Sequence, residues 1–346
     1  MADRENTLFD LLDGFEITKS EYEWLEQRFE NMTAKETILF KGAMELEGPQ
    51  GISHVMLIAS QLDHYDLYYG ASDSTALGCF VMEKIEKPSD LARPFLNAEY
   101  VGASYQKATS GVFCDGQYVR ENLPLLPFAD QPLTQQPVIG NYAIRVKLAS
   151  RSNMEGVWVG FPDTGEYMDA AHPDELLLGL DALQAENLSE CIALEVDCCL
   201  PQLTDILSQY DSAGELVRHA IDFGYAWAEQ GQGESRWEDK WQAVLELEDC
   251  HRLDLALDLA QNLQHYAFVP RGVDLAALGR ERAVLNGVIP TCGLLADAFD
   301  GEAYMQAYMN KHGLSATDHG YVAWNGGEII YEYCKPEDAL PHTLSM

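Results

Sequence analysis

The pattern of apolar positions predicts a small α+β domain in the middle of the chain. Apolar residues alternate with polar or small ones from position 142 to 148, and a second short apolar run covers residues 156–161, so both stretches are predicted strands. A helix over residues 173–186, a third strand over 191–198 and a further helix over 211–229 follow in that order. This order favours a small sheet covered by helices.

The segments on either side of this domain repeat each other. Shifting the sequence by 201 positions aligns residues 40–78 with residues 241–279 without a gap, and eleven of the 39 aligned positions are identical. A shift of 199 positions then places Tyr100, Gly102 and Tyr105 on Phe299, Gly301 and Tyr304. The identical pairs include Glu47 and Glu248, His64 and His265, Tyr65 and Tyr266, Asp73 and Asp274, and Gly78 and Gly279. The chain therefore contains a duplicated module.

Each copy of the module has similar predicted elements. Helical periodicity covers residues 33–47 in the first copy, and residues 240–248 and 251–264 in the second. A short aromatic strand follows in each copy, and its aligned histidines and tyrosines are interpreted as core or strand-edge positions. Asp73 and Asp274 stand at the N-cap of a short helix that contains Ala-Leu-Gly.

A hairpin is predicted near the end of each copy. In the first copy it covers residues 113–119 and turns at Cys114, Asp115 and Gly116. In the second copy, strands at residues 320–324 and 328–333 are joined across an Asn-Gly-Gly sequence that starts at Asn325, which is a strong turn signal.

Length and linker composition predict the domain organisation. A chain of 346 residues is expected to form two or three domains. We predict an N-terminal module over residues 1–122, a Pro-rich linker over 123–138, an α+β domain over 139–210, and a helical segment with the second module copy over 211–346. We find neither an apolar run near 18 residues nor a charged-then-apolar N-terminus, so we expect a cytoplasmic protein without membrane span or signal peptide.

The sequence has no motif of a catalytic, cofactor or metal site. It lacks a Gly-rich phosphate loop, an HExxH helix, a Gly-x-Ser-x-Gly elbow and a repeated metal-ligand cluster. The eight cysteines contain no CxxC pair, which argues against zinc and favours buried, reduced thiols, and the adjacent Cys198 and Cys199 are interpreted as packing residues. Asp249, Cys250 and His251 could place a nucleophile beside a base, but helix neighbours point about 100° apart, which favours a structural role. We expect no enzyme, no cofactor and no metal.

Acidic residues dominate the charge of the chain. It has 56 acidic and 22 basic residues, for a net charge of -34, yet 47% of its residues are hydrophobic, which is too apolar for a disordered acidic chain. Residues 152–217 hold fourteen Asp and Glu and no Lys or Arg. Duplex DNA carries two charges per roughly 3.4 Å, so the net charge matches that of about 17 base pairs, or roughly 60 Å of duplex. Such a body repels nucleic acid and attracts basic partners.

Twelve carboxylates of the middle region are candidates for a surface that imitates DNA phosphates. Carboxylates at phosphate-like spacing can take up the Lys and Arg side chains that a DNA-binding enzyme uses on its substrate. The alternative is that they form the ordinary solvated faces of helices, as in highly soluble proteins. The candidates are Glu155, Asp163, Glu166, Asp169, Asp174, Glu175, Asp181, Glu186, Glu190, Asp205, Asp211 and Glu215.

The middle and C-terminal regions resemble the ArdA antirestriction proteins, over about residues 141–333. The strand that runs from Gly156 through Trp158 is similar to the family's Gly-x-Trp strand, and the strand of residues 192–197 ends in an acidic residue, as the family's tends to. The acidic helix between them, the Leu-x-x-Tyr strand and the Gly-Tyr-Val hairpin of the last domain add to the resemblance. The first 130 residues depart from the family and resemble an added copy of its C-terminal domain.

The resemblance implies an elongated, dimer-forming protein whose carboxylates imitate double-stranded DNA and occupy the DNA cleft of a type I restriction-modification enzyme. The hypothesis is a non-enzymatic antirestriction protein of a mobile element or phage that blocks its target stoichiometrically. Two alternatives stay open. The same mimicry could act on another defence system, such as a CRISPR effector, or the chain could be an acidic oligomeric scaffold without a DNA-cleft target. Carboxylates of a mimic should line one continuous face, and those of a scaffold should be scattered.

Overall fold

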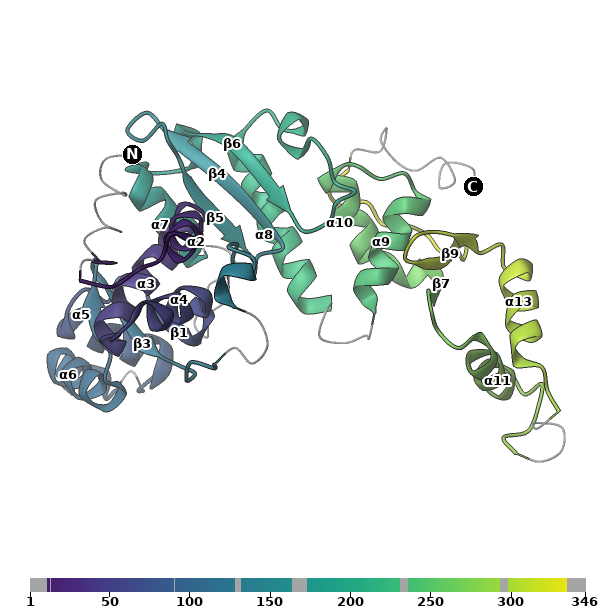
Figure 1. Ribbon diagram of the computed structural model, residues 1–346, viewed down its shortest axis with the longest axis horizontal. Helices are drawn as coiled ribbons and strands as arrows, with labels where there is room; N and C mark the ends of the chain where they lie inside the picture. The colour runs from purple at the N-terminus through teal and green to yellow at the C-terminus, as the bar shows by residue number, and fades with distance from the viewer. Residues whose placement is uncertain are drawn as a thin grey trace. The chain divides into compact units, whose positions relative to one another are not determined.

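The protein is an α+β chain that divides into two compact units. The computed structural model describes residues 11–12, 14–89, 91–127, 132–163, 173–230, 236–292 and 298–334. The first unit contains Met1–Asp197 and Ser212–Ile221, and the second contains Cys198–Asp211 and Asp222–Met346. Helices predominate in the described ranges, and the strands form three small sheets of three strands each (Figure 1). The α+β class predicted from the sequence is confirmed. None of the described helices is both long and apolar enough to cross a membrane.

The first repeat forms one of these sheets. Its central strand is β3 (Gln117–Glu121), with β1 (Tyr65–Tyr68) and β2 (Val112–Cys114) antiparallel on its two sides. Helix α3 (Ala34–Glu47) packs on β3, where Gly42 leaves room for the side chain of Val119. The other helices of the repeat are α4 (Ile52–Ser60), α5 (Ser74–Phe80) and α6 (Ala98–Thr109).

The second repeat has the corresponding elements in the same order. They are α9 (Trp237–Leu247), α10 (Leu253–Gln261), β7 (Tyr266–Pro270), α11 (Leu275–Leu285), α13 (Gly301–Lys311), β8 (Ser315–Ala316) and β9 (Gly320–Trp324). Its sheet has the strand order β7-β9-β8, which corresponds to the order β1-β3-β2 of the first repeat. The predicted duplication is therefore confirmed by element order and by sheet topology.

A glycine contact joins the paired helices of each repeat. A Cβ atom on Gly78 of α5 would lie 1.8 Å from the carbonyl oxygen of Ala98 and 3.0 Å from the backbone nitrogen of Gly102, both in α6. In the second repeat, a Cβ on Gly279 of α11 would lie 1.8 Å from the carbonyl oxygen of Gly301 in α13. The backbones of the two helices touch at these points, which only glycine permits. The aligned glycines of the sequence repeat are therefore packing positions.

A tyrosine-glutamate hydrogen bond also recurs in both repeats. The hydroxyl of Tyr65 donates to Oε1 of Glu47 over 3.0 Å, and that of Tyr266 donates to Oε1 of Glu248 over 2.8 Å. Both tyrosines are buried, and burial together with the neighbouring carboxylate raises the pKa of both hydroxyls. These tyrosines are core residues, which is one of the two positions predicted for the aligned pair.

The hairpin of the first repeat is confirmed, and that of the second is only partly right. Strand β9 forms as predicted, but it pairs with β8 and not with residues 328–333, which form no strand. Those residues return to helix α10 instead. The Asp258 carboxylate accepts the backbone amides of Glu332, Tyr333 and Cys334 over 2.7, 3.1 and 2.9 Å, and the Asn262 side chain bonds both the amide and the carbonyl of Ile330. The buried side chains of Asp258 and Asn262 thus bind the backbone groups that a neighbouring strand would otherwise bind.

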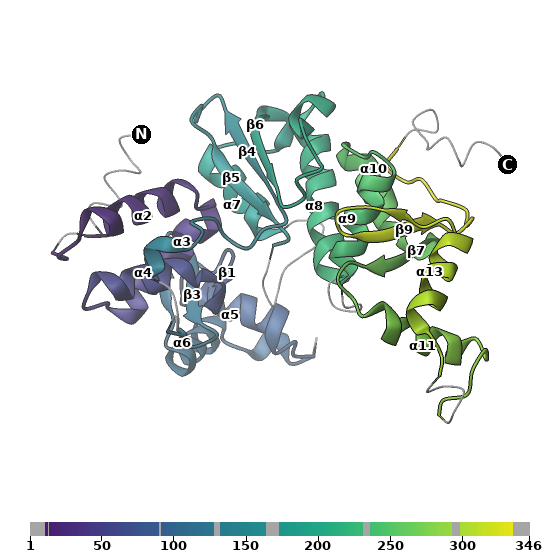
Figure 2. The same ribbon diagram turned by 45° about the vertical axis from the view of Figure 1, so that its right-hand side comes forward.

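The middle domain has the predicted order of elements. Strand β4 (Ile144–Ser150) lies between β5 (Val157–Phe161) and β6 (Cys191–Cys198), and helix α7 (Asp174–Leu183) packs on β5 (Figure 2). Helix α8 (Ala213–Gln230) follows β6. The side chains of Val146 and Val159 are fully buried between the strands and the helices. This domain is the part of the fold that the sequence predicts best.

Helix α2 (Lys19–Glu30) is not among the predicted elements. It begins with a capping box between Thr18 and Glu21, and it buries Trp24, Leu25 and Phe29. Leu25 and Phe29 lie four residues apart on one face, but the rest of the helix is mostly polar, so its apolar stripe is short. Packing against α4 holds it in place.

Candidate functional site

The structure separates the twelve candidate carboxylates into exposed and buried groups. Glu166 and Asp169 lie outside the described residues. Asp174 is half-buried, and Asp163 and Glu175 are buried. The exposed candidates are Glu155, Asp181, Glu186, Glu190 and Glu215 in the first unit, and Asp205 and Asp211 in the second.

Two exposed carboxylates lie together in the loop from α7 to β6, and a third is at the start of α8, against which this loop packs. The loop from α7 to β6 carries Glu186 and Glu190, and Oε2 of Glu190 accepts the backbone amide of Glu186 over 3.0 Å. The same loop packs against the start of α8, where a Cβ on Gly214 would lie 3.8 Å from Cβ of Leu188. Glu215 is the residue that follows Gly214 in α8. We call Glu186, Glu190 and Glu215 the α7–β6 acidic surface. The nearest basic residue along the chain is Arg218, one helical turn after Glu215.

Two further carboxylates, on strand β6, are compensated by cross-strand cations. Asp197 pairs with Arg145 over 2.8 Å, and Glu195 pairs with Lys147 over 3.2 Å. The guanidinium of Arg145 also lies 4.5 Å from the ring centroid of Trp158, which is a cation–π contact. Strand β6 therefore offers less free negative charge than the α7–β6 acidic surface.

Asp163 and Glu175 belong to a buried polar network. Asp163 is 1% and Glu175 2% exposed, so neither can contact a partner. Asp163 forms an ion pair with the buried ammonium of Lys35, and its Oδ2 accepts the backbone amide of Glu175 over 3.2 Å. The prediction that these two carboxylates lie on an exposed surface is wrong, because the first turn of α7 faces α3, and Asp163, which follows β5, is the countercharge of the buried Lys35.

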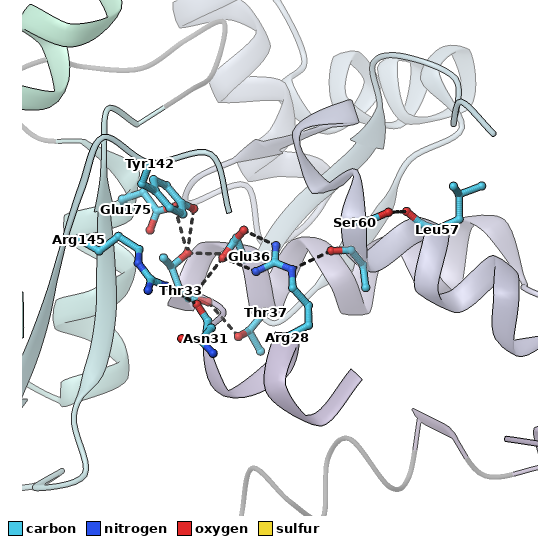
Figure 3. A network of polar contacts seen from close by, with 11 residues as sticks. Arg28, Asn31, Thr33, Glu36, Thr37, Leu57, Ser60, Tyr142, Arg145 and Glu175 are labelled. Atoms are coloured by element: carbon cyan, nitrogen blue, oxygen red, sulfur yellow. Dashed lines mark hydrogen bonds and ion pairs between the residues drawn. The ribbon is translucent and has the colours of Figure 1, made fainter. Parts of the chain in front are cut away.

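Glu175 connects helix α7 to the first repeat. Its Oε1 accepts the hydroxyls of Thr33 over 3.0 Å and of Tyr142 over 2.7 Å, as Figure 3 shows. Its Oε2 has no hydrogen-bond partner and is shielded from solvent. Burial raises the pKa of Glu175 to about 8, and the charge of Asp163 adds to this shift. A carboxyl group in this setting is more stable in its protonated form, so Glu175 is mostly neutral at neutral pH.

Arg28, Lys35 and Glu36 are the members of this network that sequence reasoning missed. Arg28 bonds both oxygens of Glu36, over 3.3 and 2.5 Å, and its Nε donates to the carbonyl of Ala59 over 2.9 Å (Figure 3). Burial opposes the charge of Lys35, but the neighbouring carboxylates, with Asp163 foremost, together outweigh it, so the pKa of Lys35 is raised. The capping box of Thr33 and Glu36 is visible in the sequence, but their burial depends on contacts with distant residues.

A cavity of about 840 Å³ lies beside this network in the first unit, lined among others by Arg28, Glu36, Tyr65 and Tyr142. Arg28 and Glu36 already pair with each other, and Tyr65 donates to Glu47. The unpartnered Oε2 of Glu175 is itself shielded from solvent. The network therefore presents no accessible unpaired charge to this cavity.

The Asp249-Cys250-His251 sequence does not form a nucleophile beside a base. Cys250 is buried, its Sγ donates to the carbonyl of Arg252 over 3.4 Å, and burial raises the pKa of this thiol to about 12. His251 is exposed, and its ring bonds the carbonyl of Gln202 and the carboxylate of Asp249. This geometry agrees with a structural role for the three residues.

All eight cysteines are free thiols. The expectation of buried thiols holds for three of them and is wrong for three exposed ones. The buried ones are Cys191, Cys250 and Cys334, and the exposed ones are Cys79, Cys199 and Cys292. Across the described parts of the chain, no group of three or more His, Cys, Asp or Glu side chains is placed to hold a metal ion.

No protein-family model, curated protein or solved structure matches this chain. The ArdA resemblance therefore stays a prediction.

Proposed function

We propose that this chain is an acidic DNA mimic that occupies the DNA-binding cleft of a type I restriction-modification enzyme and blocks it stoichiometrically. The observation that carries the proposal is the exposed α7–β6 acidic surface. Its three glutamates are exposed, and they lie in a stretch, residues 152–217, without any Lys or Arg. Basic side chains that line a DNA cleft would neutralise such carboxylates as they neutralise phosphates.

The distribution of cations supports this proposal. Lys35 and Arg28 are buried and pair with Asp163 and Glu36, and Arg145 is buried and pairs with Asp197. These cations therefore form ion pairs within the protein and cannot neutralise other carboxylates. The exposed carboxylates of the middle domain include the α7–β6 acidic surface, Glu155 and Asp181. A surface of this kind attracts a basic cleft over a distance and accelerates association.

A competition experiment tests the proposal. The full chain is titrated into a type I restriction-modification complex bound to labelled duplex DNA, at low and at high salt. We expect one equivalent to displace the DNA at low salt, and more to be required at high salt, because binding between opposite charges weakens as salt screens them. Absence of displacement at low salt would contradict the proposal for this target.

The same assay separates the alternatives. A CRISPR effector loaded on its duplex replaces the restriction complex in a parallel titration, and displacement there alone would move the target to that system. Displacement in neither assay would favour the scaffold alternative. A polyglutamate peptide of similar net charge is the control, because it carries the charge without the fold and should compete poorly.

A further inference from the structure

The loop between α5 and α6 and the first turn of α6 carry four exposed apolar side chains. Leu91 is 86%, Phe95 88%, Leu96 42% and Tyr100 74% exposed, and we call these four residues the apolar tip. The loop is folded by its own backbone, since the amide of Ala92 donates to Ser89 over 2.9 Å and that of Phe95 donates to Ala92 over 3.0 Å. A single exposed apolar residue needs no explanation, but four within ten residues of the chain indicate an interaction site.

The second repeat has a smaller version of this feature. Leu285 is 79% and Val288 54% exposed, and both follow or end α11, which corresponds to α5 of the first repeat. Both repeats therefore expose apolar residues between the two helices that touch at glycines, which are α5 and α6 in the first repeat and α11 and α13 in the second. The first repeat exposes more of them, so it carries the stronger candidate surface.

The apolar tip is nearly neutral within a strongly acidic chain. Residues 84–107 hold four basic and three acidic residues, whereas the whole chain has a net charge of -34. The basic residues are Lys84, Lys87, Arg93 and Lys107, and the acidic ones are Glu86, Asp90 and Glu99. Two copies of this chain repel each other over most of their surface, and the tip is where they can approach at low electrostatic cost. A basic DNA cleft, in contrast, attracts the acidic surfaces and gains little from the tip.

We propose that the apolar tip of the first repeat binds the same tip of a second copy of the chain in a symmetric contact. In a two-fold contact each tip covers the other, so Leu91 and Phe95 of both copies leave water together. Burial of apolar surface favours this contact, and the repulsion between two highly charged bodies opposes it. Salt screens that repulsion, so self-association strengthens as the salt concentration rises. This dependence is opposite to that of binding between the mimic and a basic target.

Sedimentation equilibrium of the full chain in roughly 0.05 M and roughly 0.5 M salt tests the contact. We expect a monomer–dimer equilibrium whose dissociation constant falls roughly tenfold at the higher salt concentration. The double variant Leu91→Ser/Phe95→Ser should be monomeric at both concentrations. Because both side chains are exposed, this variant should unfold at the same temperature as the wild type, which circular dichroism checks.

Two matched variants control for the loss of exposed apolar side chains elsewhere. Met154→Ser/Ile192→Ser alters residues that are 63% and 51% exposed in the acidic middle domain, and Leu285→Ser/Val288→Ser alters the second repeat. Both should dimerise like the wild type. The proposal is overturned if the wild type is monomeric at both salt concentrations, if its dimer weakens with salt, or if the tip variant still dimerises. It is also overturned if the second-repeat variant alone loses the dimer. DNA competition is measured separately, so the failure of one proposal leaves the other standing.

Discussion

Residue type alone does not determine what a carboxylate does in this chain; its burial decides. Glu175 and Glu186 come from the same acidic stretch, yet Glu175 is buried with a raised pKa and Glu186 is exposed. The sequence places Glu175 beside Asp174 in the first turn of a helix, where both complement the helix dipole. Only the tertiary positions of Thr33 and Tyr142 turn Glu175 inward. The number of candidate carboxylates was therefore predictable, and their separation into surface and core was not.

The stability of the protein should depend on the protonation of Glu175. Its pKa is 4.5 in the unfolded reference and about 8 in the folded protein, so between these values the folded state holds a proton that the unfolded state has lost. The contribution of this group to stability falls as pH rises through that range and is fully lost above it. Glu175→Gln cannot ionise and should be about as stable as the wild type near pH 5 and about 1–4 kcal/mol more stable near pH 9. Urea unfolding across this range measures the difference.

Glu186→Gln is the matched control for that experiment, because Glu186 is exposed and no buried partner depends on it. This variant should leave the pH dependence of stability unchanged. If Glu175→Gln follows the wild-type curve at every pH, then Glu175 is ionised in the folded protein and the account of its environment is wrong.

Removing one partner of the Lys35–Asp163 ion pair should be costly. Asp163→Asn leaves a buried ammonium without its countercharge, and we expect a loss of about 3–5 kcal/mol. The pair Lys41–Asp115 has the same residue types, but its side chains are 26% and 50% exposed. Asp115→Asn should therefore change stability by less than about 1 kcal/mol. Urea unfolding of both variants makes the comparison, and equal effects would show that Lys35 finds another partner.

At the scale of elements, short-range sequence signals predicted where helices begin and where the chain turns. Side-chain contacts between residues far apart in the sequence determined whether a predicted strand forms. The aligned N-caps Asp73 and Asp274 both accept backbone amides of the helices they precede. The turn signal at Asn325 predicts a strand after it, but Asp258 of α10 and Asn262, which caps the end of α10, bind the backbone of that segment. Such a contact joins residues about 70 positions apart in the chain, so no local pattern reveals it.

The glycine contact between paired helices gives a testable consequence. Gly78→Ala places a methyl group 1.8 Å from the carbonyl oxygen of Ala98, so α5 and α6 must move apart. We expect a loss of at least about 1–3 kcal/mol, as in other overpacked contacts, and Gly279→Ala should act in the same way on α11 and α13. Gly51→Ala is the control, because a Cβ at Gly51 meets no atom within 4 Å and its φ is -164°. Chemical denaturation measures all three, and an unchanged Gly78→Ala variant would contradict the close contact.

At the scale of the whole molecule, the sequence reveals two features, the duplicated module and the large negative charge. The repeat could be read from aligned residues because its glycines and tyrosines serve the same contacts in both copies. The net charge of -34 could be read from composition, but composition does not reveal that Lys35, Arg28 and Arg145 are withdrawn into the core. Because each of these cations pairs with one carboxylate, the groups outside the pairs keep the strongly negative net charge of the chain. This supports a role in which the surface meets a basic partner.

A distributed acidic surface should lose activity gradually as its charges are removed. The triple variant Glu186→Gln/Glu190→Gln/Glu215→Gln neutralises the α7–β6 acidic surface and keeps side chains of the same length. We expect it to compete with DNA roughly tenfold more weakly and with a shallower salt dependence, because each exposed charge contributes little by itself. Each single variant should compete almost as well as the wild type. The measurement is the DNA-displacement titration on the restriction-modification complex.

The charge-retaining variant Glu186→Asp/Glu190→Asp/Glu215→Asp is the control, because it changes the same three positions without removing a charge. It should compete nearly as well as the wild type. If both triple variants lose activity equally, shape and not charge carries the contact. If one single neutralisation abolishes competition while the fold stays intact, a single dominant contact exists and distributed mimicry is wrong. Because self-association rests on the apolar tip, the neutralised variant should still dimerise, and somewhat more tightly at low salt, since removing negative charge reduces the repulsion between copies.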